Sequence, residues 1–262
     1  MPRAGQQTTL MYHGIVGKNP LTPRDREEGA GLYDVAVDDF REQLLFLKNH
    51  HYPIKPLEQF NHISNSKPGF KTIVLTFDDG EMNNFREALP ILQEFQFPAY
   101  FFVTVNKIGN PGYMGWEELK ELISLGMVVG SHSLTHPILT GLEDEKLGQE
   151  LKESKRILEE KLGIKIENFS VPHGFYDEGV VKMALEVGYR HIFVSEINPR
   201  LKNCIGRMAV KSHWSLRRFK MGLEGKVPLT EEFLSLGQIV CRCALGDSGY
   251  DRFRKMILRL NR

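Results

Sequence analysis

The chain has 262 residues, which exceeds a typical domain of about 150 residues and is close to the roughly 250 residues that one α/β barrel requires. Its 34 basic and 33 acidic side chains give a formal net charge of +1, which argues against nucleic-acid binding through a concentrated positive face. A hydrophobic content of 41% is sufficient for a packed core and excludes a disordered chain. No apolar run approaches the ~20 residues of a membrane-spanning helix.

Targeting and redox features are sparse. The opening MPRAGQQTTLMYHG contains no apolar stretch of signal-peptide length. The three cysteines, Cys204, Cys241 and Cys243, are too few and odd in number for a disulfide framework. Cys241 and Cys243 could bind a metal ion, but no second cysteine pair accompanies them, so reduced thiols are the simpler interpretation. These features predict a cytoplasmic protein.

Strand-like and helix-like stretches alternate along the chain. Short apolar and β-branched runs predict strands at 8–13, 72–77, 99–105, 127–130, 169–171 and 189–195. Helical periodicity predicts a helix capped by Asp38 or Asp39, with Phe40, Leu44 and Leu47 on one face, and further helices at 83–96, 116–125, 143–162 and 177–187. This alternation indicates parallel strands covered by helices, as in a barrel or an open doubly wound sheet. The absence of a glycine-rich nucleotide motif favours the barrel.

The pattern changes near the C-terminus. Two helix-like stretches follow the segment 227–230, and the last of them carries five basic residues and one acidic residue. One face of that stretch is apolar and contains Phe253, Met256, Ile257 and Leu260. Such a face usually packs against its own protein, and contact with a partner or with the inner membrane surface is the alternative. We therefore expect a catalytic barrel over 1–222 and a helical extension over 223–262.

The strongest local signal is Thr76-Phe77-Asp78-Asp79-Gly80, which directly follows a predicted buried strand. Successive side chains of an extended chain point in opposite directions, so one carboxylate can bind a metal ion while its neighbour faces a substrate water. Gly80 permits a sharp turn away from the strand. By itself this sequence is often only a turn.

A second signal is Ser131-His132-Ser133-Leu134-Thr135-His136-Pro137, which again follows a predicted strand. Two histidines four residues apart on a helical turn project from one face and can converge on one metal ion. With Asp79 they would form a set of two histidines and one carboxylate that leaves positions open for water and substrate.

These two motifs resemble those of the polysaccharide deacetylases of carbohydrate esterase family 4, T-F-D-D-G and H-[ST]-x-x-H-P. The resemblance extends from about residue 8 to about residue 220. It implies an irregular (β/α)7 barrel with one divalent metal ion, usually Zn²⁺, at the carboxyl ends of the strands; Co²⁺, Ni²⁺ or Fe²⁺ would also suit such ligands. It further implies that Asp78 is the general base and that Asp79, His132 and His136 bind the metal ion.

The third motif of the family is commonly R-x-P-x-G, and the corresponding segment here is Ser170-Val171-Pro172-His173-Gly174. Ser170 therefore replaces the arginine that braces the base in many members. By resemblance, the backbone N–H of His173, between Pro172 and Gly174, helps to stabilise the oxyanion of the reaction.

The opening Met11-Tyr12-His13 resembles one branch of the family, which includes poly-N-acetylglucosamine deacetylases and places the late histidine motif at the N-terminus. This resemblance makes His13 the expected general acid, and a core histidine at a strand end is the alternative. His213 lies where an unpermuted member carries its late histidine and is the second candidate for the acid. Arg207 could replace the missing arginine by pairing with Asp78, or it could be an ordinary solvated arginine.

These residues predict a metal-dependent hydrolase that removes N-acetyl groups from an amino sugar in an acetylated glycan or glycan precursor. Asp78 would take a proton from the attacking water, and a histidine would donate one to the departing amine. Tyr113 and Tyr176 are expected to form walls of the substrate groove. The alternatives are an O-acetyl esterase or amidohydrolase on the same barrel, and a catalytically silent member that binds glycan. Nucleic acid is not an expected partner.

Overall fold

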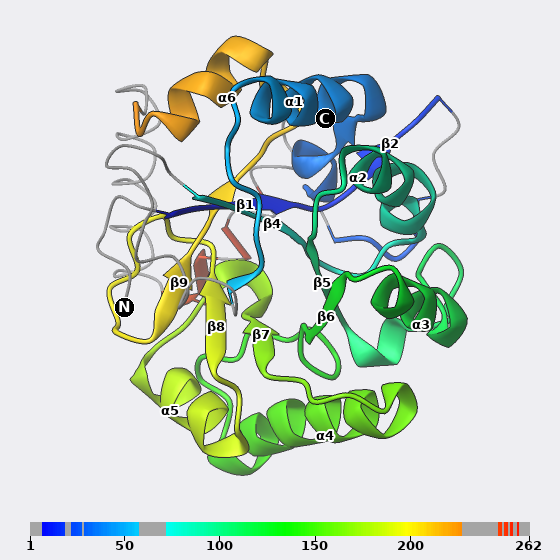
Figure 1. Cartoon of the computed structure of the whole chain (residues 1–262). Coiled ribbons are helices and arrows are strands. Elements are labelled where there is room, and N and C mark those ends of the chain that lie inside the picture. The colour runs from blue at the N-terminus through cyan, green and yellow to red at the C-terminus, as the bar shows by residue number, and fades with distance from the viewer. Residues whose placement is uncertain are drawn as a thin grey trace.

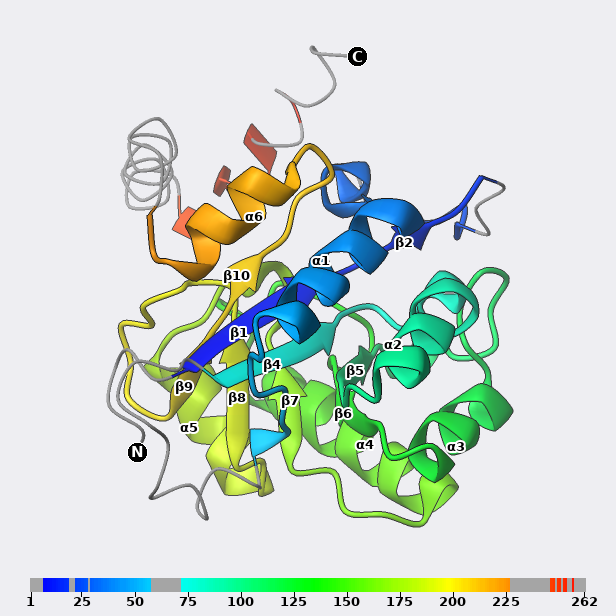
Figure 2. The same ribbon diagram turned by 45° about the horizontal axis from the view of Figure 1, so that its top comes forward.

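The computed structural model describes residues 7–18, 22–27, 29–57 and 72–226, and, near the C-terminus, residues 246, 247, 249, 250, 252, 253 and 256. Its centre is a parallel sheet with the strand order β10-β1-β4-β5-β6-β7-β8-β9 (Figures 1 and 2). These strands are β1 (Gln7–Tyr12), β4 (Thr72–Phe77), β5 (Tyr100–Val103), β6 (Val128–Ser131), β7 (Asn168–Ser170), β8 (His191–Val194), β9 (Cys204–Gly206) and β10 (Met208–Ala209). A separate short pair is formed by β2 (Ile15–Val16) and β3 (Val35–Ala36).

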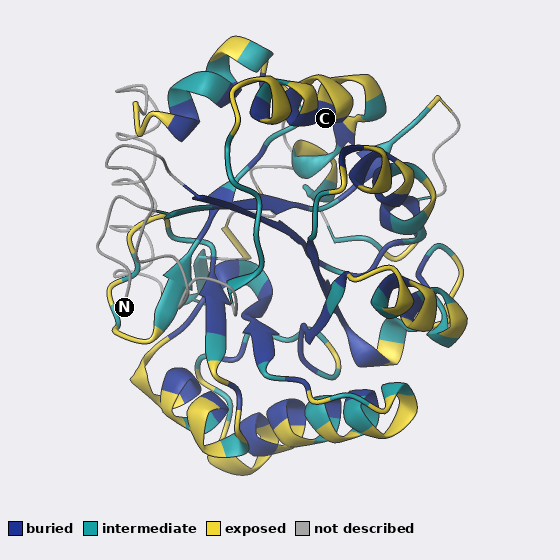
Figure 3. Cartoon of the chain, viewed as in Figure 1, coloured by how far each residue is buried: buried dark blue, intermediate teal, exposed yellow. Residues whose placement is uncertain are grey.

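Helices surround the strands, as Figures 1 and 2 show from two directions. They are α1 (Val37–Asn49), α2 (Leu89–Phe95), α3 (Trp116–Ser124), α4 (Asp144–Leu162), α5 (Glu178–Val187) and α6 (Leu216–Leu223). Each helix presents a buried face to the strands and an exposed face to solvent (Figure 3). The expected alternation of parallel strands and covering helices is confirmed.

From β1 to β9 the strands of this sheet follow one another in chain order. The sheet is closed into a barrel by the segment that contains β9 and β10. β9 pairs with β8, whereas β10 pairs with β1. Only Arg207 separates β9 from β10, so the six residues 204–209 join the two edges of the sheet. When this segment is counted as one strand, the sheet has seven strand positions. The predicted irregular (β/α)7 barrel is therefore confirmed, and the alternative of an open doubly wound sheet is wrong.

The two faces of β4 explain how the barrel presents its chemistry. Ile73, Leu75 and Phe77 belong to the large core between strands and helices, while Val74 belongs to a small aromatic cluster with Tyr100, Phe102 and Phe193. Alternation along a strand therefore places Thr76 and Asp78 on the same side as Val74. Asp78 extends this row at the carboxyl end of the strand, where the loops of such barrels carry function.

The helix expected at 83–96 is present, but it consists of two successive helices of different type. It begins as a π-helix over Asn84–Ala88 and continues as α2. Pro90, in the first turn of α2, has no backbone N–H and cannot donate to the carbonyl four residues earlier, which explains the wider turn before it. The capping prediction for α1 is wrong: Ala36 is the N-cap, and Asp38 and Asp39 lie in the first turn.

Most of the expected extension over 223–262 lies outside the described residues, as do Cys241, Cys243, Ile257 and Leu260. Two of its described residues contact the barrel: Asp247 accepts a hydrogen bond from Thr140, and Tyr250 lies edge-on to Phe175. Phe253 and Met256 are exposed. Within the described part of the chain, no helix combines the length and apolar character needed to cross a bilayer.

Candidate active site

The two consecutive carboxylates leave β4 through a tight turn. Both Asp79 and Gly80 have left-handed backbone conformations, with φ of 72° and 77°. A Cβ at position 80 would lie 2.9 Å from Cγ1 of Val103, so glycine is required here for its size as well as its freedom. The strained conformation of Asp79 is of the kind that folded proteins retain at functional positions.

Asp78 is buried, 2% exposed, and its carboxylate is held by Arg207. Nη1 of Arg207 donates to Oδ1 and Nη2 donates to Oδ2, each over 2.7 Å. Ser170 joins the pair, because its hydroxyl accepts from Nη2 of Arg207 over 2.8 Å and donates to Oδ2 of Asp78 over 3.2 Å. Burial opposes ionisation of Asp78, but the charges of Arg207 and His132 outweigh it and hold the pKa of Asp78 below its ordinary value.

Arg207 is therefore not a solvated arginine. It is 1% exposed, and its guanidinium lies near the rings of Phe102 and Phe193, 5.7 and 5.9 Å from the two ring centroids. The arginine that pairs with Asp78 comes from the closing segment of the barrel, while the serine at motif position 170 is small enough to share its hydrogen bonds. Arg207 thus makes the contact with Asp78 that the arginine of the third motif was expected to make.

His132 and His136 lie on a loop, and the expectation of a helical turn is wrong. Ser133 and His136 have positive φ values of 65° and 67°, and the Ser133 hydroxyl accepts from the backbone N–H of His136. The carboxylate of Glu150 on α4 holds the loop through hydrogen bonds from Leu134 N, Thr135 N and the Thr135 hydroxyl. The loop still brings the two imidazoles together, with ring centroids 4.8 Å apart.

The two imidazoles aim lone pairs at one point. Nδ1 of His132 faces the carbonyl oxygen of Ser170 at 2.8 Å, and Nδ1 of His136 faces Oε1 of Glu27 at 2.9 Å. Since these oxygens accept, each Nδ1 carries a proton, and in the neutral imidazole each Nε2 is left with a lone pair. The two Nε2 atoms are 3.2 Å apart, and Oδ1 of Asp79 lies 3.6 and 3.3 Å from those of His132 and His136.

This arrangement fits a divalent metal ion. Ligands about 2.0–2.1 Å from a tetrahedral Zn²⁺ are separated from one another by about 3.3 Å. The three separations among Asp79, His132 and His136, 3.2, 3.3 and 3.6 Å, fall around that value. Three electron-pair donors at such distances repel one another unless a cation lies between them, so the donor set suits the metal ion that the sequence predicts.

The protonation of the three groups agrees with this geometry. Burial lowers the pKa of His132 to about 4. Burial also disfavours charge on His136, but hydrogen bonds to Asp79 and Glu27 outweigh it and raise the pKa of His136 to about 9. Although burial opposes its ionisation, the bond and charge of His136 hold the pKa of Asp79 well below its usual range. Without a cation, a proton on His136 therefore takes the place that a metal ion would take.

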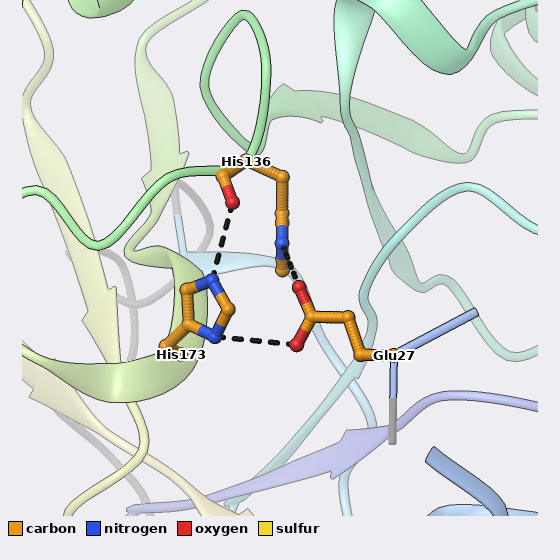
Figure 4. Close-up of side chains that lie close together, drawn as sticks. All are labelled: Glu27, His136 and His173. Atoms are coloured by element: carbon orange, nitrogen blue, oxygen red, sulfur yellow. Dashed lines mark hydrogen bonds and ion pairs between the residues drawn. The ribbon is translucent and has the colours of Figure 1, made fainter. Parts of the chain in front are cut away.

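Glu27 contacts this site, and the sequence did not reveal it. Its Oε1 faces Nδ1 of His136, and its Oε2 lies 3.3 Å from Nδ1 of His173 (Figure 4). His173 closes the ring of contacts through Nε2, which donates to the carbonyl oxygen of His136 over 3.1 Å. Glu27 lies in the charged run PRDREE, which has the composition of a solvated surface segment, so no sequence signal distinguishes it.

The third-motif segment forms a single turn, Pro172–Gly174, directly after β7 and Val171. His173 and Gly174 both have positive φ, 56° and 72°, and a Cβ on Gly174 would lie 2.8 Å from the side chain of Ser195. The turn therefore depends on glycine at 174. The oxyanion role of the His173 backbone N–H stays a prediction.

His13 directly follows β1, whose Tyr12 carbonyl oxygen accepts from the backbone N–H of Asp78 over 3.0 Å. Its charge lowers the pKa of both Asp78 and Asp79, which places its ring near them. Its Nδ1 is buried and has no hydrogen-bond partner among the described residues, and the ring lies against Tyr33 with centroids 4.9 Å apart. His213, by contrast, is exposed in the turn after β10, beside a buried Trp214. The contacts favour His13 over His213 as the acid candidate.

Tyr113 and Tyr176, the expected groove walls, are both 3% exposed. The Tyr176 hydroxyl donates to Glu196 over 2.7 Å and accepts from the backbone N–H of Arg200. Tyr113 is hydrogen-bonded to Asp25 and lies near Asp79 and Glu81. Tyr113 thus borders the site, and stacking of a sugar on either ring stays a prediction.

Comparison with known proteins agrees with the motifs. Residues 65–192 match the family model described as "Polysaccharide deacetylase". The putative polysaccharide deacetylase YxkH of Bacillus subtilis is 28% identical over 183 residues, which cover 69% of this chain and 61% of YxkH. The poly-beta-1,6-N-acetyl-D-glucosamine N-deacetylase of Staphylococcus epidermidis is 22% identical over 204 residues, 70% of each chain. The part of YxkH that this chain matches, 61% of its length, is less than two thirds of that protein.

A solved structure supports the fold. The Streptococcus pyogenes deacetylase PplD, determined in complex with acetate, superposes with a TM-score of 0.71 at 23% identity, over 83% of this chain and 97% of PplD. At this identity the similarity concerns the fold. The family match identifies a polysaccharide deacetylase domain over residues 65–192, and the two intact motifs and the parallel barrel agree with it.

Proposed function

We propose that the chain is a metal-dependent hydrolase that removes N-acetyl groups from an amino sugar of an acetylated glycan. The observation that carries the proposal is the convergence of Asp79, His132 and His136 on one point, next to a buried Asp78 that Arg207 keeps ionised. The names of two relatives, a putative polysaccharide deacetylase and an N-deacetylase of poly-N-acetylglucosamine, support the substrate class.

The side chains divide the reaction among them. Asp79, His132 and His136 would hold the metal ion. When bound, it would polarise both the acetyl carbonyl of the substrate and the water that attacks this carbonyl. Asp78 removes a proton from that water as its oxygen forms a bond to the carbonyl carbon. The pair with Arg207 keeps Asp78 ionised and fixes its direction before substrate arrives.

The second half of the reaction breaks the bond between the carbonyl carbon and the sugar nitrogen. An amine leaves readily only when it is protonated, so the departing nitrogen must receive a proton. His13 is the candidate donor, because its ring lies near both aspartates. The products are acetate and a free amino sugar, and the water supplies the oxygen that remains on acetate.

Acetate release tests the proposal. The substrates are N-acetylated oligosaccharides, nucleotide sugars and one O-acetyl ester, and the proteins are the metal-stripped chain, the chain reloaded with zinc or cobalt, and Asp78→Asn. Release that metal restores and Asp78→Asn abolishes supports the deacetylase, and the preferred substrate distinguishes a polymer from a precursor. Strong preference for the ester would favour the esterase alternative. Glycan binding without release from any substrate would favour the catalytically silent alternative.

A further inference from the structure

The segment 22–27 reaches the candidate metal site from a part of the chain that carries none of its three ligands. Arg26 pairs with Asp34 through both terminal nitrogens, at 2.7 and 2.5 Å, and its Nε lies 2.6 Å from Oε1 of Glu81. Pro23 packs so closely on Gly112 that a Cβ there would lie 2.7 Å from Cα of Pro23. These contacts hold the backbone on both sides of Asp25, and Glu27, the residue after Arg26, faces His136.

Glu27 uses its two carboxylate oxygens on two different motifs. Oε1 accepts a hydrogen bond from Nδ1 of His136, 109 residues away, and Oε2 faces Nδ1 of His173 (Figure 4). His173 in turn donates from Nε2 to the backbone carbonyl of His136. Glu27 therefore holds the imidazole of His136 while His173 holds its backbone, and Glu27 and His173 also contact each other.

The orientation of the imidazole decides what His136 can offer a metal ion. A bond from Nδ1–H to a carboxylate selects the tautomer with a lone pair on Nε2, and it also makes that nitrogen a stronger donor. Nε2 of His136 points at the place shared by Nε2 of His132 and Oδ1 of Asp79. Residues in this supporting position typically change metal affinity by about 10–100-fold when they are removed.

We propose that Glu27 is a positioning residue for this metal site: by bridging His136 and His173, it sets the direction of the Nε2 lone pair of His136 and ties this ligand to the third-motif turn. The proposal rests on the proposed function, because it requires a metal ion at Asp79, His132 and His136. It assigns to the segment 22–27 a part in building a site whose ligands follow β4 and β6.

Zinc affinity provides the test, measured by competition with a chromophoric chelator on the full chain. We expect Glu27→Ala to weaken zinc binding about 10–100-fold. Glu27→Gln keeps an oxygen that accepts from Nδ1 of His136, so it should retain most of the affinity. Glu27→Asp keeps the charge but withdraws both oxygens by one methylene, so it should lose affinity almost as Glu27→Ala does. The matched control is Asp25→Asn, which removes a nearby charge that lies beside Tyr113 and should bind zinc like the wild type.

Cobalt gives a second readout that a merely structural role would not change. The visible absorption of bound Co²⁺ depends on ligand geometry, so Glu27→Ala and Glu27→Asp should alter its intensity and shape, and Asp25→Asn should not. If Glu27→Ala does not fold, Glu27→Gln and Glu27→Asp carry the same comparison. Unchanged zinc affinity and an unchanged cobalt spectrum in Glu27→Asp would overturn the proposal, as would a loss of stability in the metal-free protein with no change in affinity.

A failure of the proposed function has a different signature. If the wild type binds no zinc, or if Asp79→Ala binds it as tightly as the wild type, the metal ion does not occupy these three ligands, and the proposed function fails together with this inference. If the wild type binds zinc and Asp79→Ala does not, the Glu27 variants judge the positioning role alone.

Discussion

Arg207 and Asp78 are 129 residues apart in the chain, yet they form a two-bond ion pair inside the barrel, with both N···O distances at 2.7 Å. Arg207 is also the single residue between β9 and β10, the two short strands that join the edges of the sheet. The closure of the barrel and the charge on the candidate base therefore depend on the same residue. A defect at position 207 should be visible in stability as well as in catalysis.

The first prediction concerns stability. Arg207→Met leaves the carboxylate of Asp78 buried without its partner, and removal of one member of a buried pair costs about 3–5 kcal/mol. We expect the free energy of unfolding in urea to fall by that amount. The control is the double variant Arg207→Met/Asp78→Asn, in which no charge is left behind and much of the loss should be recovered. Equal losses in the single and double variants would show that packing near Phe102 and Phe193, and not the charge, is responsible.

The second prediction concerns pH. Burial opposes ionisation of Asp78, but Arg207 and His132 outweigh it, so its pKa in the folded protein is lowered. A base works only when ionised, so this group supports activity at pH values above the lowered pKa, and activity is lost as pH falls through it. We expect the acidic limb of kcat/KM in Arg207→Gln to move to higher pH, because the charge that opposes the effect of burial most strongly is then removed. Profiles of metal-saturated wild type and variant test this, and coincident acidic limbs would contradict it.

The sequence predicted most of the barrel because its signals are local. The strand at 72–77 has the predicted bounds, since an unbroken apolar run identifies a strand buried on both faces, and the helix expected at 116–125 ends one residue earlier, at Ser124. The short strands β9 and β10 were missed. With three and two residues, they are too short for a periodic signal, and they exist because both edges of the sheet offer partners.

The same distinction separates the site residues. Asp78, Asp79, His132 and His136 stand in contiguous motifs that follow strands, so their chemistry could be inferred before their positions were known. Their local backbone could not: the loop from His132 to His136 depends on hydrogen bonds to Glu150 of a distant helix. Glu27 acquires its role only when the segment 22–27 is folded against the barrel, so its neighbours in sequence carry no indication of it.

The third prediction concerns metal loading. A ligand that binds only the folded state stabilises it by about 2.7 kcal/mol when its free concentration is 100 times Kd. We expect saturating zinc to raise the unfolding temperature of the metal-free wild type, and we expect no such rise in His132→Ala or His136→Ala, each of which removes one of three donors. His213→Ala, which changes an exposed histidine, is the matched control and should respond to zinc like the wild type. A full response in His132→Ala would place the metal ion elsewhere.

The fourth prediction distinguishes the two candidate acids. His13 lies near both aspartates and against Tyr33, whereas His213 is exposed. General acid catalysis contributes about 10²–10⁴-fold to such reactions, so His13→Asn should lower kcat for an N-acetyl substrate by a factor in that range, and His213→Asn should leave it near the wild-type value. An activated O-acetyl ester provides an internal control, because its leaving group departs without a proton. On that ester, His13→Asn should lose much less activity than on the amide. Equal losses on both substrates would mean that His13 supports the structure of the site and does not donate the proton.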